Sequence, residues 1–350
     1  MRVLCLTKYT RLGASSRMRS FQYFPYLQQQ GITISVSPLF GDDYLTALYS
    51  GKKRTGLIIK SYIKRLFVLF TIFKYDRIVI EKELFPYFPA FFEWLLKRLG
   101  IKYIVDYDDA IFHIYDQHPN GIFKRMLGTK IDKVMRYSHL VAAGNVYLAA
   151  RAKNAEARQI SIVPTVIDLE RYPQKKHTEH HPLIIGWIGT KSTFEKHFLE
   201  IKELIKLALE RFNIEFHVIG AGTGLDLGDR VKYFSWSEET EVSSILNFDI
   251  GIMPLTDSLW EKGKCAYKLI QYMACGLPVI ASPVGMNKTV VKHGENGYLA
   301  STNEEWLEAL ERYISDQDLR AAHGQTGRSI VENEYCLQQT KMKVLDLLSS

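Results

Sequence analysis

Short apolar runs alternate with stretches of helical periodicity along the whole chain of 350 residues. In the first half, the runs that favour strands are 2–6, 33–37, 77–80, 102–105, 139–142 and 160–163. Helical segments fit between them. Because strands separated by helices pair in parallel, this order predicts a doubly wound sheet with helices on both faces.

The polar stretch 171–181, RYPQKKHTEHH, interrupts the periodicity and is the best linker in the sequence. The pattern then restarts, with strands expected at 183–188, 214–219, 249–253 and 278–281 and helices at 194–211 and 265–274. A last helix is expected at 336–348. The sequence therefore predicts an α/β protein with two Rossmann-like domains, 1–170 and 171–325, and a helical segment 326–350 that packs back on the first domain.

The composition is that of an ordinary folded protein, with 47% apolar and 24% charged residues. It excludes collagenous, disordered and disulfide-scaffold proteins. The four cysteines Cys5, Cys265, Cys275 and Cys336 are widely spaced and show no zinc-site pattern, so a reducing cytoplasm fits best. The longest apolar runs, 66–73 and 84–92, are about half of the ~20 residues needed to cross a bilayer, so we expect no membrane span.

The net charge of +7 admits nucleic acid, phosphorylated ligands or an anionic membrane surface as partners. No zinc finger, RNP motif or basic-region heptad is visible, so no nucleic-acid partner is expected. Much of the positive excess is interleaved with apolar stretches between 52 and 100, at Lys52, Lys53, Arg54, Lys60, Lys64, Arg65 and Lys74. This segment resembles an interfacial surface that inserts aromatic residues and attracts lipid phosphates. Two core helices with solvated basic faces are the alternative.

A doubly wound sheet binds its ligands beyond the carboxyl ends of its strands, so the loops there are the first candidates for a site. The first such loop, 10–19, joins strand to helix through Gly13, Ala14 and Ser15 and carries three arginines, Arg17 and Arg19 among them. Backbone amides at a helix start and nearby guanidinium groups hold phosphate or a sugar hydroxyl. A plain N-cap by a serine is the alternative. A nicotinamide dinucleotide site is not expected because G-x-G-x-x-G is missing.

The second loop places three carboxylates, Asp106, Asp108 and Asp109, at a strand end. Strand alternation puts Asp106 and Asp108 on one side, where they could hold a divalent metal or supply a base or a sugar clamp. A helix N-cap with spare acids explains the same residues without any ligand.

The third and fourth loops belong to the second half of the chain. Gly189, Thr190 and Lys191 end its first strand and mirror the first loop. The helix expected at 265–274 has Lys262, Lys264 and Lys268 near its start, where lysines oppose the helix dipole. An anion between them, such as a pyrophosphate, makes sense of this placement; solvated lysines are the alternative.

The sequence MACGLPVIAS at 273–282, with Gly285 and HGENGYL at 293–299, resembles the donor-site half of family 4 glycosyltransferases of the GT-B fold. VPTVID at 163–168 is similar to the interdomain segment of that family, and the loop at Gly13 is similar to its glycine loop. The resemblance implies two Rossmann-like domains facing a cleft. It also implies a retaining transfer, without metal or other cofactor, from a nucleotide-sugar held mostly by the second domain.

The chain departs from the family pattern at three positions. The paired glutamates of the E-x7-E motif would fall at 263 and 271, where this chain has Gly263 and Gln271. Thr190 stands where the family has an arginine, and Lys191 or Lys196 is expected to supply the charge instead. We expect Lys264 and Lys268 to replace part of these groups at the pyrophosphate.

We therefore expect a metal-independent, hexosyltransferase-like enzyme that acts in cell-surface polysaccharide synthesis on a polysaccharide or lipid-linked acceptor. The catalytic candidates are Asp108 and Asp109, which would contact the sugar or the acceptor hydroxyl. The expected donor-binding residues are Gly13, Ala14, Ser15, Arg17, Gly189, Thr190, Lys191, Lys264, Cys265, Ala266, Tyr267, Lys268 and Gln271. The expected location is the cytoplasm, with peripheral attachment to the inner face of the plasma membrane.

Three other functions compete with this one. The first is a metal-dependent GT-A enzyme that uses Asp106 and Asp108, which leaves the second half of the chain unexplained. The second is a nucleotide-sugar epimerase of the same fold. The third is a non-catalytic glycan-binding or assembly subunit that has lost the glutamate pair.

Overall fold

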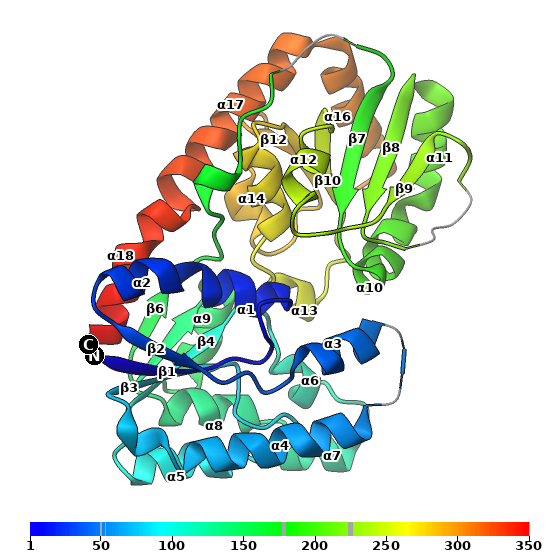
Figure 1. The fold of residues 1–350 in the computed structure, drawn as a ribbon. Coiled ribbons are helices and arrows are strands. Elements are labelled where there is room, and N and C mark those ends of the chain that lie inside the picture. The colour runs from blue at the N-terminus through cyan, green and yellow to red at the C-terminus, as the bar shows by residue number, and fades with distance from the viewer. Residues whose placement is uncertain (50, 53, 177–179, 223–226, 350) are drawn as a thin grey trace. The chain divides into compact units, whose positions relative to one another are not determined.

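The computed structural model describes the chain except residues 50, 53, 177–179, 223–226 and 350 (Figure 1). The expected surface cation Lys53 and part of the expected linker thus lie outside the described residues. Unit 1 consists of Met1–Thr165, Gly263–Cys265 and Thr340–Ser350, and unit 2 of Val166–Lys262 and Ala266–Gln339. In this division the described residues of 171–181 belong to unit 2.

In the described residues of unit 1, six parallel strands form one sheet in the order β2-β1-β3-β4-β5-β6. Their β-branched and aromatic residues favour extended backbone, and the two central strands are almost entirely buried. The predicted strands of this half are confirmed to within two residues at each end. The strands are β1 (Arg2–Leu6), β2 (Thr33–Val36), β3 (Arg77–Glu81), β4 (Tyr103–Tyr107), β5 (Leu140–Ala143) and β6 (Ile160–Ile162).

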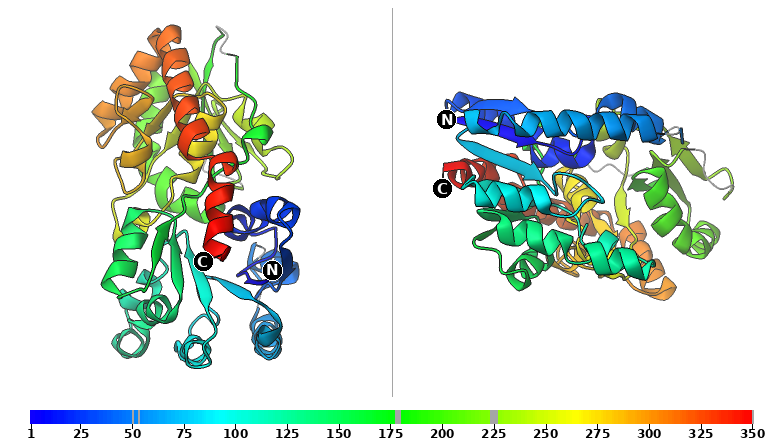
Figure 2. Two further views of the ribbon diagram at one scale, coloured as in Figure 1. Left: turned by 90° about the vertical axis from the view of Figure 1, so that its left-hand side faces the viewer. Right: turned by 90° about the horizontal axis from the view of Figure 1, so that it is seen from below.

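Helices cover both faces of this sheet (Figures 1 and 2). On one face lie α1 (Ala14–Arg19), α2 (Phe24–Gln29) and the last helix, α18 (Leu337–Ser349); on the other lie α4 (Thr55–Leu69), α5 (Phe91–Arg98) and α8 (Lys130–Tyr137). The remaining helices are α3 (Asp42–Tyr49), α6 (His113–Asp116), α7 (Gly121–Leu127) and α9 (Val146–Asn154). Two hydrogen bonds fix α18 on the sheet of unit 1: one joins Tyr23 Oη and Thr340 Oγ1 (2.9 Å), and in the other Arg77 Nε donates to the Leu348 carbonyl (3.0 Å).

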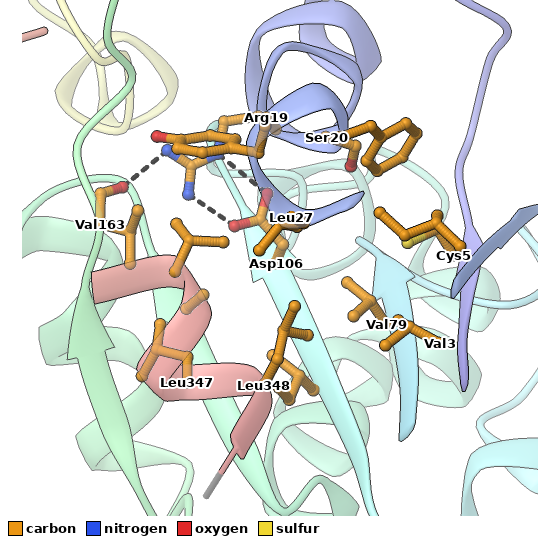
Figure 3. A pocket seen from close by; sticks show the side chains of 16 residues that line it. Val3, Cys5, Arg19, Ser20, Leu27, Val79, Asp106, Val163, Leu347 and Leu348 are labelled. Carbon is orange, nitrogen blue, oxygen red and sulfur yellow. Dashed lines mark hydrogen bonds and ion pairs between the residues drawn. The ribbon is translucent and has the colours of Figure 1, made fainter. Parts of the chain in front are cut away.

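A small cavity of about 60 Å³ lies between the sheet, α2 and α18 (Figure 3). Apolar side chains line most of it, including Cys5, Val79, Leu27 and Leu348. It is a gap in the packing of α18 on the sheet, and the buried pair of Arg19 and Asp106 closes one end.

Helix α4 corrects one expectation about the surface. Arg65 was expected among the exposed cations, but it is 1% exposed, and its Nη2 donates to the carbonyls of Thr7 (2.8 Å) and Ser37 (2.9 Å). Burial lowers the pKa of this guanidinium to about 10. Arg65 therefore belongs to the interior of unit 1, whereas Lys60 and Lys64 are exposed on the same helix.

The described residues of unit 2 form a second parallel sheet of six strands, in the order β12-β11-β10-β7-β8-β9. The strands are β7 (Leu183–Ile188), β8 (Ile214–Ile219), β9 (Val231–Phe234), β10 (Ile250–Met253), β11 (Val279–Ala281) and β12 (Gly297–Leu299). The predicted strands are confirmed, but the two edge strands β9 and β12 were missed. They have only four and three residues, and β9 alternates between buried and exposed positions instead of forming an apolar run.

Two apolar layers complete unit 2. On one face α11 (Lys202–Arg211) and α16 (Asn303–Ser315) pack on the sheet, and on the other α12 (Glu241–Ile245), α14 (Tyr267–Ala274) and α17 (Gln317–Glu334) do so. The helix expected at 194–211 is divided into α10 (Lys191–Thr193), a π turn (Phe194–Phe198), a 3₁₀ turn (Leu199–Ile201) and α11. Two short helices, α13 (Leu259–Lys262) and α15 (Asn287–Val290), lie in connections. No helix in the part of the chain described is both long and apolar enough to cross a bilayer.

Candidate functional site

The carboxyl edge of the unit 1 sheet is a cluster of buried charges. β3 ends at Glu81, which accepts hydrogen bonds from the Lys8 backbone N–H (2.9 Å) and Ser16 Oγ (2.6 Å). The next residue, Lys82, has a left-handed backbone with φ 68°, and its N–H donates to the Asp106 carbonyl of β4 (2.9 Å). A left-handed backbone is strained for lysine and persists only where the surrounding structure holds it. Such strained residues are common at functional sites.

Lys82 holds the two predicted catalytic carboxylates together. Its Nζ lies 2.9 Å from Asp108 Oδ1 and 3.7 Å from Asp109 Oδ2. Ser15 Oγ also donates to Asp108. Burial raises the pKa of Asp108, but Lys82 and Ser15 outweigh it and lower the pKa to about 2. Asp108 is therefore a fixed anion, and Asp109, whose side chain is 32% exposed against 12% for Asp108, is the more accessible carboxylate.

Asp106 forms an ion pair with Arg19. Arg19 Nε and Nη2 donate to its two oxygens over 2.9 and 2.5 Å, and Arg19 Nη1 donates to the Val163 carbonyl (2.6 Å; Figure 3). A bidentate pair of this kind fixes both side chains. Asp106 and Asp108 thus each face a protein cation. In the described residues no three His, Cys, Asp or Glu side chains gather as a metal would require.

The first loop lies at the start of α1. Gly13 is its N-cap residue, Ala14 is exposed in the first turn, and Ser15 reaches Asp108. Arg17 is buried, and its Nη1 donates to the Arg11 carbonyl (3.3 Å). Of the donor-binding residues predicted in this loop, Ser15 is the one that contacts a predicted catalytic carboxylate, whereas Arg17 donates to the backbone of the loop.

The short segment Gly263–Cys265 groups with unit 1. Asn145 Nδ2 donates to the carbonyls of Gly263 (2.9 Å) and Lys264 (3.2 Å), and the Cys265 thiol donates to the Asp108 carbonyl (3.1 Å). Burial raises the pKa of Cys265 to about 12, so the thiol is neutral. A Cβ at position 263 would lie 2.4 Å from Ala110 Cβ, which explains the glycine where the family has a glutamate.

The corresponding edge of unit 2 has a different chemistry. Gly189 follows β7, where a Cβ would lie 2.5 Å from the Trp187 ring. Thr190 caps α10 and accepts from the Thr193 N–H (3.4 Å). Lys191 is exposed and lies 4.0 Å from Glu195. An exposed pair of this kind contributes little, so Lys191 is held loosely at the surface.

The expected helix 265–274 begins two residues later, at Tyr267, because Ala266 has a left-handed backbone with φ 53°. The first-turn amides of Tyr267, Lys268 and Leu269 have no acceptor inside the helix, as at every helix start. Lys268 Nζ lies 4.3 Å from the centre of the Trp187 ring. The start of α14 therefore offers backbone donors beside a cation held over an aromatic face.

Gln271 is buried and part of a network that the sequence did not reveal. Its Nε2 donates to Glu241 Oε1 (2.7 Å) and Tyr172 Oη (3.0 Å), and Trp236 Nε1 donates to Glu241 Oε2 (2.7 Å). A glutamate at 271 would bring two carboxylates together, so the amide is explained by Glu241. Nothing in the acidic run 238–241 distinguishes Glu241 before the fold is known.

Glu261 is a second carboxylate that was missed. Its side chain is fully buried, and it accepts from Lys196 Nζ (2.7 Å) and Ser258 Oγ. Burial raises its pKa, but Lys196 and Ser258 outweigh this effect and leave it below the usual value. Lys196, one of the two cations expected to replace the family arginine, is thus committed to an ion pair.

Known proteins share parts of this sequence and its fold. Residues 182–316 match the family described as glycosyl transferases group 1. A UDP-Gal:alpha-D-GlcNAc-diphosphoundecaprenol alpha-1,3-galactosyltransferase of Escherichia coli is 25% identical over 215 residues, which cover 54% of this chain and 54% of that protein. The match therefore spans about half the length of this curated relative.

Solved structures match over nearly the whole chain. Anabaena Alr3699/HepE in complex with UDP and glucose has a TM-score of 0.70 at 15% identity and covers 100% of this chain and 99% of that one. Sucrose-phosphate synthase from Thermosynechococcus elongatus has a TM-score of 0.70 at 13% identity, over 99% and 98% of the two chains. The predicted GT-B fold is confirmed by these structures, and residues 182–316 match the glycosyl transferases of group 1, as the sequence resemblance predicts.

Proposed function

We propose that the protein is a retaining glycosyltransferase that moves a sugar, of the hexosyl type, from a nucleotide-sugar to a lipid-linked glycan or polysaccharide in cell-surface polysaccharide synthesis. The observation that carries the proposal is the match of residues 182–316 to group 1 glycosyl transferases on a unit whose strand ends and α14 start offer glycines, amides and lysines. Structural relatives solved with UDP support a nucleotide-sugar as donor.

On the donor side, the pyrophosphate binds at the first-turn amides of α14 and near Lys264 and Lys268. These positive groups stabilise the nucleoside diphosphate as the bond from its oxygen to the anomeric carbon breaks. Because protein cations and amides meet the phosphate charge, the reaction needs no divalent metal. Gly189 and Thr190 line the neighbouring strand end, where backbone can approach the donor closely.

On the acceptor side, Asp109 contacts the incoming hydroxyl. Lys82, which is itself paired with Asp108, holds the Asp109 carboxylate in place. Asp109 is favoured over Asp108 because its side chain is more exposed and Asp108 is committed to Lys82 and Ser15. The acceptor oxygen bonds to the anomeric carbon on the face that the diphosphate leaves. Its proton passes to Asp109 or to the departing phosphate oxygen.

The acceptor is a sugar carried by a lipid, and the enzyme works at an anionic membrane surface on the cytoplasmic side. The named activity of the curated relative, whose acceptor is a GlcNAc-diphosphoundecaprenol, supports a lipid-linked acceptor. The basic and aromatic surface of unit 1 supports the location.

The test is release of nucleoside diphosphate from UDP-, GDP- and ADP-sugars in EDTA, with and without a lipid-linked sugar acceptor. We expect release from one donor that depends on the acceptor and is lost in Asp109→Asn, with donor binding retained. An interconversion of donor sugars without release would favour an epimerase instead. Donor binding without any turnover would favour the non-catalytic subunit, and a strict need for Mg²⁺ or Mn²⁺ would contradict the metal-free mechanism.

A further inference from the structure

Helix α4 presents an apolar stripe to solvent. Ile59, Ile63, Phe67 and Phe70 recur at spacings of three or four residues and so share one face of the helix. Phe67 and Phe70 are 66% and 71% exposed, although the opposite side of α4 already buries Arg65 and Leu69. A helix that is apolar on its outer face as well as its inner one needs a further apolar environment.

The stripe continues over neighbouring elements of unit 1. Tyr62 Oη of α4 donates to the Pro86 carbonyl (2.5 Å), which joins α4 to the loop before α5. In this loop and α5, a chain of ring contacts runs through Phe85, Phe88, Phe92, Phe91 and Trp94. Tyr87 contacts Phe123 of α7, with ring centres 6.0 Å apart. The exposed apolar residues of this outer face are Ile59, Ile63, Leu66, Phe67, Phe70, Phe73, Tyr87, Phe88, Phe91, Trp94, Ile122 and Met126.

The charges around the outer face are almost all positive. Its exposed cations are Lys60, Lys64, Lys74, Lys97, Arg98, Lys124 and Arg125. Of the carboxylates between 55 and 100, Glu81, Glu83 and Glu93 are buried, and Asp76 accepts from the Arg2 backbone N–H (2.6 Å). Exposed aromatics within a rim of lysine and arginine are complementary to a bilayer with anionic headgroups.

The outer face is tied to the carboxylate edge by a short, well-anchored segment. Lys82 and Tyr87 are five residues apart, so their Cα atoms are at most about 18 Å apart. Between them, Lys130 Nζ donates to Glu83 and to the Phe85 carbonyl (2.6 Å), and the Tyr87 N–H donates to Tyr115 Oη (3.0 Å). The segment that joins Lys82 to Tyr87 is therefore anchored to α8 through Lys130 and to α6 through Tyr115.

We propose that the outer face of unit 1 inserts its aromatic side chains into an anionic lipid surface, and that the 82–87 segment holds the Cα of Lys82, the partner of Asp109, within about 18 Å of the Cα of Tyr87 at that surface. The second part rests on the proposed function. A sugar joined to a membrane lipid through a diphosphate would have its hydroxyl groups in this range. The outer face thus selects acceptors whose reactive sugar lies close to the headgroups.

Co-sedimentation with vesicles of phosphatidylcholine, with and without phosphatidylglycerol, tests the docking. The wild type should sediment with phosphatidylglycerol vesicles at about 0.1 M salt and be released at about 1 M, where screening is much stronger. Each basic residue near an anionic surface is worth about fivefold in partitioning, from its ~1 kcal/mol. Lys60→Glu with Lys64→Glu should therefore weaken partitioning by at least about 30-fold.

The chain offers a matched control in unit 2. Lys202 and Lys206 have the same spacing on exposed positions of α11. Lys202→Glu with Lys206→Glu should leave sedimentation unchanged. Phe67→Ala with Phe70→Ala should weaken binding while leaving folding intact, because both rings lie largely in solvent.

Failure of the wild type to bind phosphatidylglycerol vesicles would overturn the proposal, and so would equal loss in the Lys202 and Lys206 control. A self-association in sedimentation velocity that Phe67→Ala with Phe70→Ala abolishes would assign the face to a second copy instead. Nucleoside diphosphate binding, measured on the same samples without vesicles, separates these outcomes from a failure of the proposed glycosyltransferase function.

Discussion

The two sheets have the same kind of parallel topology but opposite chemistry at their carboxyl edges. In unit 1 the edge carries charges that neutralise one another, with Arg19 on Asp106 and Lys82 on Asp108. In unit 2 the edge carries glycine, threonine and the start of α14, and the connections after β7 and β10 add the ion pair of Lys196 and Glu261. The same architecture thus supports paired aspartates directly at the strand ends in one unit, and glycine, threonine and helix-start amides with lysines in the other.

This difference indicates what each edge can bind. Where the charged side chains are already paired with one another, they gain no further ion pair from a charged ligand. Their fixed acceptor oxygens can instead position a neutral hydroxyl group. An edge of helix-start backbone donors and half-exposed lysines is electropositive, which suits an anionic ligand. The unit 1 edge therefore suits a sugar acceptor, and the unit 2 edge suits a phosphorylated donor.

The largest effect should come from breaking a unit 1 pair. Arg19→Met leaves Asp106 buried without its cation, and we expect a loss of about 3–5 kcal/mol in the free energy of unfolding. Lys268→Met in unit 2 removes a cation from the Trp187 ring and should cost only about 1 kcal/mol. Urea denaturation measures both. Adding Asp106→Asn to Arg19→Met should restore most of the loss, and equal costs in the two units would refute the contrast.

The pH dependence of stability should sharpen the comparison. The pKa of Asp108 is about 2 in the folded chain against 3.8 ordinarily, so its contribution of about 2 kcal/mol is present above about pH 4 and lost as the pH falls toward 2. In Lys82→Met, burial acts without the opposing charge and the pKa rises, so this contribution is absent. The difference in unfolding free energy between wild type and Lys82→Met should therefore grow from pH 2 to pH 6.

Lys60→Met, which removes an exposed lysine, is the control for this titration and should give a difference that does not change with pH. If the difference in unfolding free energy between wild type and Lys82→Met also stayed constant with pH, Lys82 would not be the residue that keeps Asp108 charged.

A smaller effect is expected when the family glutamate is restored in unit 2. Gln271→Glu places a second carboxylate beside Glu241 and should cost about 1–3 kcal/mol at neutral pH, with recovery as the pH falls and one of them protonates. Exchanging both residues, Gln271→Glu with Glu241→Gln, should regain most of the loss. If the exchange is no better than the single change, Glu241 is not the reason for Gln271.

Strands and family could be predicted because their signals are local. β1, β3 and β7 each contain an uninterrupted apolar run, and the 273–282 motif is contiguous. β9 and β12 could not be recognised, since each is short and depends on pairing with one neighbour at a sheet edge. The start of α14 was placed too early because the left-handed backbone of Ala266 follows from its surroundings rather than from alanine itself.

The predicted carboxylates were found, but their partners were not. Asp108 and Asp109 were selected from one loop, whereas Lys82 comes from the end of the neighbouring strand. Because β3 and β4 are neighbours in the sheet, their carboxyl ends lie together. The pairing of Lys82 with Asp108 could therefore have been predicted once these two strands were assumed to be adjacent. Glu241 and Gln271 are 30 residues apart and meet only through the packing of α12 and α14, which no local pattern encodes.

The central claim is that this chain binds a nucleoside diphosphate through groups near α14. Calorimetric titration of UDP, GDP and ADP in EDTA tests it most directly, on wild type, Lys264→Ala and Lys191→Ala. We predict that one of the three binds wild type and that Lys264→Ala weakens it about 10- to 100-fold, the value of a charged hydrogen bond, while Lys191→Ala has little effect. Absence of binding by all three, or an unchanged affinity in Lys264→Ala, would contradict the account.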